Sequence, residues 1–90
     1  MAVKRLRIHG LVQGVGFRYS MANRAKALNV SGWVKNRRDG TVEAMVSGAD
    51  ADVERLIDWA RRGPPGAKVT ILEISDDSGG FDGFDLLPTD

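Results

Sequence analysis

The sequence predicts an α+β sandwich in which one antiparallel sheet is covered on one face by two helices. Three observations lead to this fold class: an N-terminal segment with apolar residues at every second position, two segments with apolar residues at helical spacing, and a hairpin signal between them. The predicted order is β-α-β-β-α-β, with room for a short fifth strand at the end. We expect one domain over residues 1–90, since a second core would be too small in a chain of this length.

The first strand and the loop after it are indicated by the first sixteen residues or so. Residues 3–9 alternate between apolar and polar side chains, with Leu6 and Ile8 on one face, which is typical of a half-buried strand. A loop is predicted next, because three glycines follow in close succession and let the backbone turn where a Cβ would clash. These glycines are Gly10, Gly14 and Gly16.

The middle of the sequence predicts a helix followed by a hairpin. Apolar residues recur along a single stripe over residues 17–28, and Asn29 fits the C-terminal end of that helix. Residues 30–38 return as a strand. Asp39 and Gly40 form a hairpin signal of the two-residue type that needs positive φ.

The rest of the chain repeats the pattern. Residues 41–47 form the partner strand of the hairpin, and residues 50–62 form an amphipathic helix that Gly63 and two prolines terminate. A further strand is predicted around residues 69–74, and residues 81–87 could add a short last one. Two split βαβ units in this order build a ferredoxin-like sandwich.

Composition excludes several classes of protein. The chain has no cysteine, which rules out a disulfide framework, a thiolate zinc site and a cysteine nucleophile. Its apolar runs are too short to span a membrane, and its N-terminus lacks the apolar core of a secretory signal. We therefore expect a cytoplasmic protein without a membrane partner, and a monomer is the simplest state for this size.

Charge is distributed unevenly, although the net charge is only +1 and too small to argue for nucleic acid. Residues 1–38 carry nine Lys and Arg side chains and no acid, whereas the rest carries four bases and all twelve acids. This asymmetry suggests an anionic ligand near the N-terminal half. A solvated basic face explains the same pattern, and charge alone favours that simpler interpretation.

The glycine-rich loop at residues 10–18 lies between a predicted strand and the start of a helix. Unpaired backbone N–H groups there can bind an anion, and the Arg18 guanidinium can take two phosphate oxygens at once. The loop lacks the Gly-Lys-Ser/Thr of a Walker loop, and Tyr19 stands where a dinucleotide fingerprint needs glycine. Glycines at such a junction can also serve only as turn-makers, so both interpretations stay open.

Two motifs resemble the signatures of the acylphosphatase family. Residues 8–18, IHGLVQGVGFR, contain the pattern G-x-V-Q-G-V-x-F-R. Residues 32–42, GWVKNRRDGTV, followed by Gly48, contain G-[FYW]-V-K-N-x-x-x-G-x-V with its final glycine. Residues 63–67 are also similar to this family, so the resemblance covers nearly the whole chain. The tail departs from it, since family members often end in an aromatic residue.

The resemblance implies a ferredoxin-like fold and a metal-independent hydrolase that splits small-molecule acyl phosphates, releases inorganic phosphate and uses no cofactor. Arg18 would hold the phosphoryl oxygens together with backbone N–H groups of the loop, and Asn36 would position the attacking water. Without the motif, Asn36 would be interpreted as a polar residue that caps the hairpin turn. The implied substrate-binding residues are Gly14, Val15, Gly16, Phe17 and Arg18.

Two alternative functions remain. Ferredoxin-like sandwiches serve many functions, so a non-enzymatic binding module is one of them. We expect no nucleic-acid partner, because residues 41–46 lack the aromatic pattern of an RNA-recognition sheet. The second alternative is carbamoyl phosphate handling in hydrogenase maturation, where similar domains stand at the front of larger proteins. A single domain without zinc-finger cysteines favours a stand-alone enzyme.

The remaining candidate residues favour structural roles. His9, the only histidine, lies on an alternating strand and is expected to be structural or solvent-facing. Trp33 and Trp59 are expected to pack rather than to stack on a ligand. The late acids, Asp76 and Asp77 among them, show no compact pattern of oxygen ligands, so no metal site is expected.

Overall fold

The computed structural model describes residues 1–90 and contains five strands and two helices in the order β-α-β-β-α-β-β. The elements are β1 (Ala2–Leu11), α1 (Phe17–Ala27), β2 (Ser31–Asn36), β3 (Val42–Gly48), α2 (Asp50–Arg62), β4 (Lys68–Asp76) and β5 (Phe84–Leu86). The predicted element order is confirmed, including the short last strand. Neither helix is long and apolar enough to cross a membrane.

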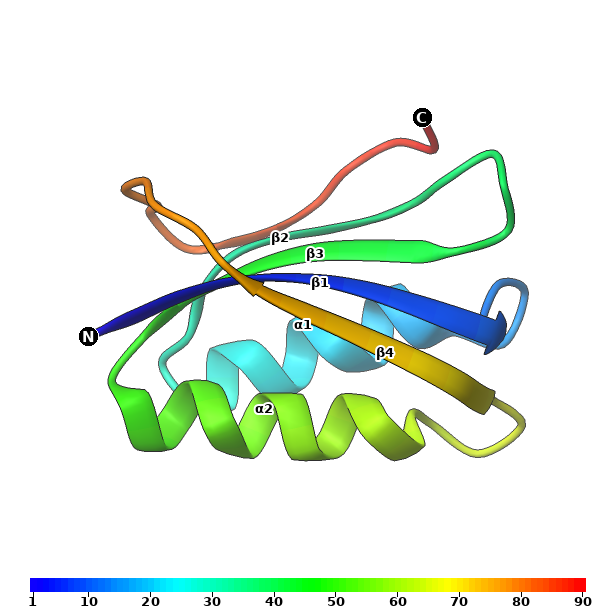
Figure 1. Ribbon diagram of the computed structural model, residues 1–90, viewed down its shortest axis with the longest axis horizontal. Helices are drawn as coiled ribbons and strands as arrows, with labels where there is room; N and C mark the ends of the chain where they lie inside the picture. The colour runs from blue at the N-terminus through cyan, green and yellow to red at the C-terminus, as the bar shows by residue number, and fades with distance from the viewer.

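All five strands belong to one sheet, in the order β4-β1-β3-β2-β5. β1 is antiparallel to β3 and β4, and β2 is antiparallel to β3, as the sequence predicted. β5 pairs in parallel with β2, so the complete sheet is mixed. The cause is the reversal of the chain after β4, which sends the tail in the direction of β2 along the opposite edge of the sheet (Figure 1).

Both helices cover the same face of the sheet, and the hydrophobic core lies between the two layers (Figure 1). Leu6 and Ile8 of β1 point into this core, because successive strand residues face opposite sides of a sheet. The rings of Phe17, at the start of α1, and Trp59, in α2, meet with their centroids 5.4 Å apart. Phe17 therefore anchors the N-terminus of α1 in the core.

Gly10 was predicted to begin the loop, but it lies within β1. The register of β1 against β4 shifts between His9 and Gly10, where φ is 124°. A Cβ on Gly10 would lie 2.0 Å from the carbonyl oxygen of Lys68. This glycine thus permits a bulge and a close approach of two strands, a use of glycine that the sequence pattern did not distinguish from a loop.

The hairpin between β2 and β3 differs from the predicted two-residue type. Gly40 has a φ of 92°, but Asp39 is not in the positive region. The Arg37 N–H donates to the Thr41 carbonyl (2.8 Å), and the Gly40 N–H donates to the Arg37 carbonyl (3.1 Å). These bonds close a three-residue loop in which only the last residue is left-handed. The Asp-Gly signal located the turn correctly and gave the wrong turn type.

Candidate active site

The glycine-rich loop after β1 and the hairpin after β2, which carry the two sequence motifs, lie at the same end of the molecule (Figure 1). β1 and β2 run in the same direction, because both are antiparallel to β3. Their C-terminal ends, Leu11 and Asn36, therefore lie at the same edge of the sheet, next to the N-terminus of α1. Figure 1 shows the β1–α1 loop, the β2–β3 hairpin and the C-terminus together at this end.

The β1–α1 loop presents a row of unpaired donors. No N–H group from Gln13 to Tyr19 donates a hydrogen bond to another backbone group, and the first to do so is that of Ser20, to Gly16 (3.0 Å). Gly14 and Gly16 have φ values of 76° and 77°, and no atom lies within 4 Å of where their Cβ would be. Gly16 caps α1 without a side chain. Such an open loop at the positive end of a helix suits an anion.

Arg18 lies in the first turn of α1 and is half-buried. Its Nη1 donates to the carbonyl oxygen of Leu87 (3.2 Å), and the N–H of Leu87 donates in turn to the carbonyl of Val34 on β2 (2.9 Å). A guanidinium has five N–H donors in a fixed plane. The C-terminal tail, through Leu87, thus orients one edge of the Arg18 guanidinium and leaves its other N–H donors for a ligand.

Asn36 is the last residue of β2 and pairs with Val42 of β3. It is two residues beyond Val34, which is fully buried in the core, so its side chain lies on the helix-covered face. Its carbonyl accepts from the N–H of Asp90 (3.1 Å). The alternative that Asn36 caps the turn is not what the structure shows, because Asp39 Oδ1 accepts there from the backbone and the side chain of Thr41 (3.0 and 2.6 Å).

Gln13 was not singled out by the sequence, yet it connects the loop to the hairpin. Its Nε2 donates to the carbonyl oxygens of Arg37 (2.7 Å) and Thr41 (2.9 Å). These two carbonyls belong to the residues that close the hairpin beside Asn36. Neither periodicity nor spacing marks this glutamine. Its place in the first motif was the one signal that could have drawn attention to it.

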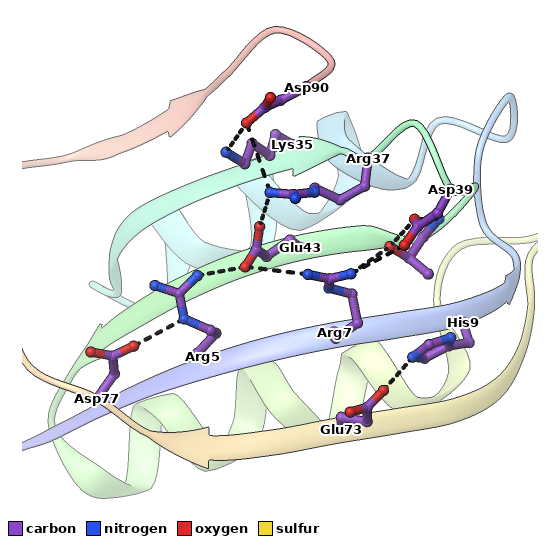
Figure 2. A network of polar contacts seen from close by, with 11 residues as sticks. Arg5, Arg7, His9, Lys35, Arg37, Asp39, Glu43, Glu73, Asp77 and Asp90 are labelled. Carbon is purple, nitrogen blue, oxygen red and sulfur yellow. Dashed lines mark hydrogen bonds and ion pairs between the residues drawn. The ribbon is translucent and has the colours of Figure 1, made fainter.

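The open face of the sheet, on the side opposite the helices, carries four of the nine N-terminal Lys and Arg side chains in ion pairs (Figure 2). Buried Glu43 contacts Arg5, Arg37 and Arg7, with N–O distances of 2.5, 2.9 and 3.8 Å. The hydrogen bond from Lys35 (2.8 Å) lowers the pKa of the Asp90 carboxyl below its ordinary value. These side chains are therefore neutralised by acids of the protein, and this part of the basic run is not the solvated basic face that the simpler interpretation predicted.

The other candidates lie away from the loop. His9 Nε2 lies 2.5 Å from Glu73 Oε1 on the open face of the sheet. Trp33 lies under the cationic groups of Lys35 and Arg5, at 5.1 and 5.9 Å from its ring centroid. Trp59 packs in the core. No group of three or more His, Cys, Asp or Glu side chains is placed to hold a metal ion.

Comparisons with known proteins agree on one family. The acylphosphatase family model matches residues 4–86. An acylphosphatase of Acidovorax sp. is 54% identical over 83 residues, which cover 88% of this chain and 86% of the relative.

Solved structures give the same result. A crystal structure of acylphosphatase from Bacillus subtilis superposes with a TM-score of 0.92 at 34% identity, covering 97% of this chain and 99% of that one. A structure of full-length HypF, in a phosphate- and nucleotide-bound form, matches 99% of this chain at 26% identity and a TM-score of 0.89, but over only 12% of its own length.

Proposed function

The chain belongs to the acylphosphatase family and is an enzyme of that family, and from this premise we propose how it works. It hydrolyses the carboxyl–phosphate anhydride of small acyl phosphates to a carboxylate and inorganic phosphate. Arg18 and the backbone N–H groups of Gly14 to Arg18 hold the phosphoryl group, and Asn36 orients the attacking water.

The observation that carries this proposal is the row of unpaired N–H groups next to a half-buried arginine. Backbone donors left without partners normally raise the free energy of a fold unless water or a ligand satisfies them. Two of these groups belong to Gly14 and Gly16, each of which has open space where a Cβ would lie. A phosphoryl group offers the negative oxygens that both the N–H groups and the guanidinium need.

This site needs neither a general acid nor a metal for the proposed reaction. The leaving group is a carboxylate with a pKa of about 4 to 5, so it departs without a proton. A loose transition state also demands little of the nucleophile, which leaves positioning and positive potential as the main tasks. A neutral amide such as that of Asn36 can orient water through hydrogen bonds, and its place on the helix-covered face supports this role.

The proposal extends to the setting of the enzyme. We propose a single domain over residues 1–90 that acts as a monomer in the cytoplasm, on small molecules rather than on nucleic acid or membranes, and without a cofactor. Light scattering of the purified protein would test the monomer. A mass twice the 9.8 kDa of the chain would contradict it.

The test is hydrolysis of benzoyl phosphate by the purified protein in EDTA, beside Arg18→Ala and a simple phosphate monoester. We expect chelator-resistant cleavage of the acyl phosphate alone, and a loss of at least about a hundredfold in kcat/KM for Arg18→Ala, the scale for a preorganised charge-stabilising donor. Arg24→Ala removes an exposed arginine from the same helix and is the matched control. Near-normal turnover by folded Arg18→Ala would contradict the role of Arg18.

A second candidate function is supported by the match to a short segment of HypF. In that case the site would serve as the carbamoyl phosphate-handling part of a larger assembly. Rates on carbamoyl phosphate and benzoyl phosphate separate the two. A strong preference for carbamoyl phosphate would favour the second candidate, and no cleavage of either by a folded protein would favour a binding module.

A further inference from the structure

Apolar side chains hold the phosphate-binding loop against the core, because Val12 and Phe17 are buried in it and Val15 packs against it, but few hydrogen bonds fix the distance of the loop from Asn36. Its N–H groups make no backbone hydrogen bonds. Its two glycines, Gly14 and Gly16, have left-handed backbone conformations and no side chain that could contact the rest of the protein. The Gln13 side chain is the exception. It is half-buried and reaches from the loop to the base of the β2–β3 hairpin.

The chemistry of this contact fixes the orientation of the amide. The two atoms that Gln13 meets, the carbonyl oxygens of Arg37 and Thr41, are both acceptors. Only the NH₂ end of a carboxamide can satisfy both, since it carries two donors. The same two carbonyls accept from the Gly40 and Arg37 N–H groups that close the hairpin. Gln13 therefore binds the two carbonyl groups that close the hairpin directly after Asn36, the last residue of β2.

We propose that Gln13 is a positioning residue, which holds the phosphate-binding loop in register with Asn36 through two hydrogen bonds to the β2–β3 hairpin. The inference rests on the proposed function of the loop and of Asn36. Gln13 itself does not touch the reacting atoms: its amide acts by keeping the attacking water of Asn36 in line with the phosphoryl group held by the loop and Arg18. A small misplacement of reacting groups can cost up to about a hundredfold in rate.

This role predicts a separation of turnover from phosphate binding. The loop N–H groups and the anchor of Arg18 on Leu87 do not involve the Gln13 side chain. Gln13→Met has a similar length and no donors. We expect it to lower kcat by about tenfold to a hundredfold, while the inhibition constant of inorganic phosphate changes by less than about threefold.

A double-mutant cycle identifies the residue through which Gln13 acts. In the Asn36→Ala background, Gln13→Met should lower kcat by less than about twofold, because the water is no longer held and its misplacement costs nothing more. An additive loss in the double variant would overturn the proposal. The single Asn36→Ala variant separates a failure of the proposed function from a failure of this inference. Normal turnover in that variant would contradict the proposed role of Asn36 and not the contact of Gln13 with the hairpin.

Gln13→Glu keeps the shape of the side chain and gives a pH signature. An ionised Glu presents only acceptors to the two carbonyls, whereas a protonated one can donate a single hydrogen bond. We expect a variant that loses kcat at neutral pH and recovers part of it as the pH falls, a limb that the wild-type profile lacks. A purely structural role would instead lower the melting temperature and leave kcat and the pH profile of the folded protein unchanged, which would overturn the proposal.

Discussion

The open face of the sheet and the β1–α1 loop are both rich in donors, but only the open face pairs them within the protein. Glu43, whose side chain is 5% exposed, pairs with three arginines, two from β1 and one from the β2–β3 hairpin (Figure 2). In the loop, the N–H groups from Gln13 to Tyr19 have no backbone partner. The paired region supports the fold, and the unpaired one is where we propose that the ligand binds. A single count of positive charge along the chain could not separate these two regions.

The largest expected effect comes from Asn36, on the side of the molecule where we propose that the ligand binds. Asn36→Ala should lower kcat on benzoyl phosphate by about a hundredfold and affect KM less, because the amide orients water after the substrate has bound. Unfolding in urea should change little, since the backbone of β2 keeps its hydrogen bonds. Asn23→Ala, an exposed asparagine on α1, is the control. A kcat close to that of the wild type would remove Asn36 from the mechanism.

On the open face, the largest expected effect comes from Glu43. Glu43→Gln should lower the free energy of unfolding by about 2 kcal/mol, because three guanidinium groups lose the carboxylate between them. The loss stays below that of a fully buried pair, since the arginines are partly exposed and water can reach them. Urea unfolding measures it. The kcat/KM of the folded variant should equal that of the wild type, and a parallel loss of activity would show that the two regions are coupled.

The third prediction compares two glycines with the same backbone requirement. Gly16 (φ 77°) and Gly66 (φ 91°) both have open space where a Cβ would lie. Gly16→Ala and Gly66→Ala should each cost about 1 kcal/mol of stability, since alanine disfavours the left-handed region. Gly16→Ala alone should also weaken inhibition by inorganic phosphate, because only Gly16 belongs to the loop that we propose binds the phosphoryl group. Equal phosphate inhibition in both variants would place the anion elsewhere.

Most of the fold could be predicted because its signals are local. Alternation identified β1, and helical spacing identified α1 and α2. Asn29, predicted as the C-terminal residue of the first helix, instead lies two residues after the end of α1 at Ala27, and its φ of 58° is typical of a left-handed residue that follows a helix. The parallel pairing of β5 could not be predicted, since it depends on where a short tail lies after a reversal of the chain. Gly10 and Asp39 show that glycine and turn signals locate a feature without giving its geometry.

The sequence proposed the residues of the candidate site but not the contacts that connect them. Motifs named Arg18 and Asn36, and the parallel course of β1 and β2 brings the ends of both strands to one edge. The contacts of Gln13 with the hairpin and of Arg18 with Leu87 span 24 to 69 residues, so no local pattern encodes them. The charge run misled for the same reason, because the acids that neutralise it come from distant strands.

The smallest expected effect concerns Asp77, at the edge of the open face, and it depends on pH. The Ser78 N–H, followed by Arg5, lowers the pKa of the Asp77 carboxyl below its ordinary value of 3.8. The folded state therefore binds this proton less readily than the unfolded state. The contribution of the ionised Asp77 to stability is present above about pH 4 and is lost as the pH falls through the folded pKa.

The wild type should therefore have a higher unfolding free energy than Asp77→Asn at about pH 6, and the difference should shrink steadily below about pH 4. Urea titrations across this range measure it, and a difference that stays constant down to the lowest pH would assign the effect to packing rather than to charge. Benzoyl phosphate turnover at neutral pH should be the same for both proteins, since Asp77 belongs to the region whose donors are paired within the protein.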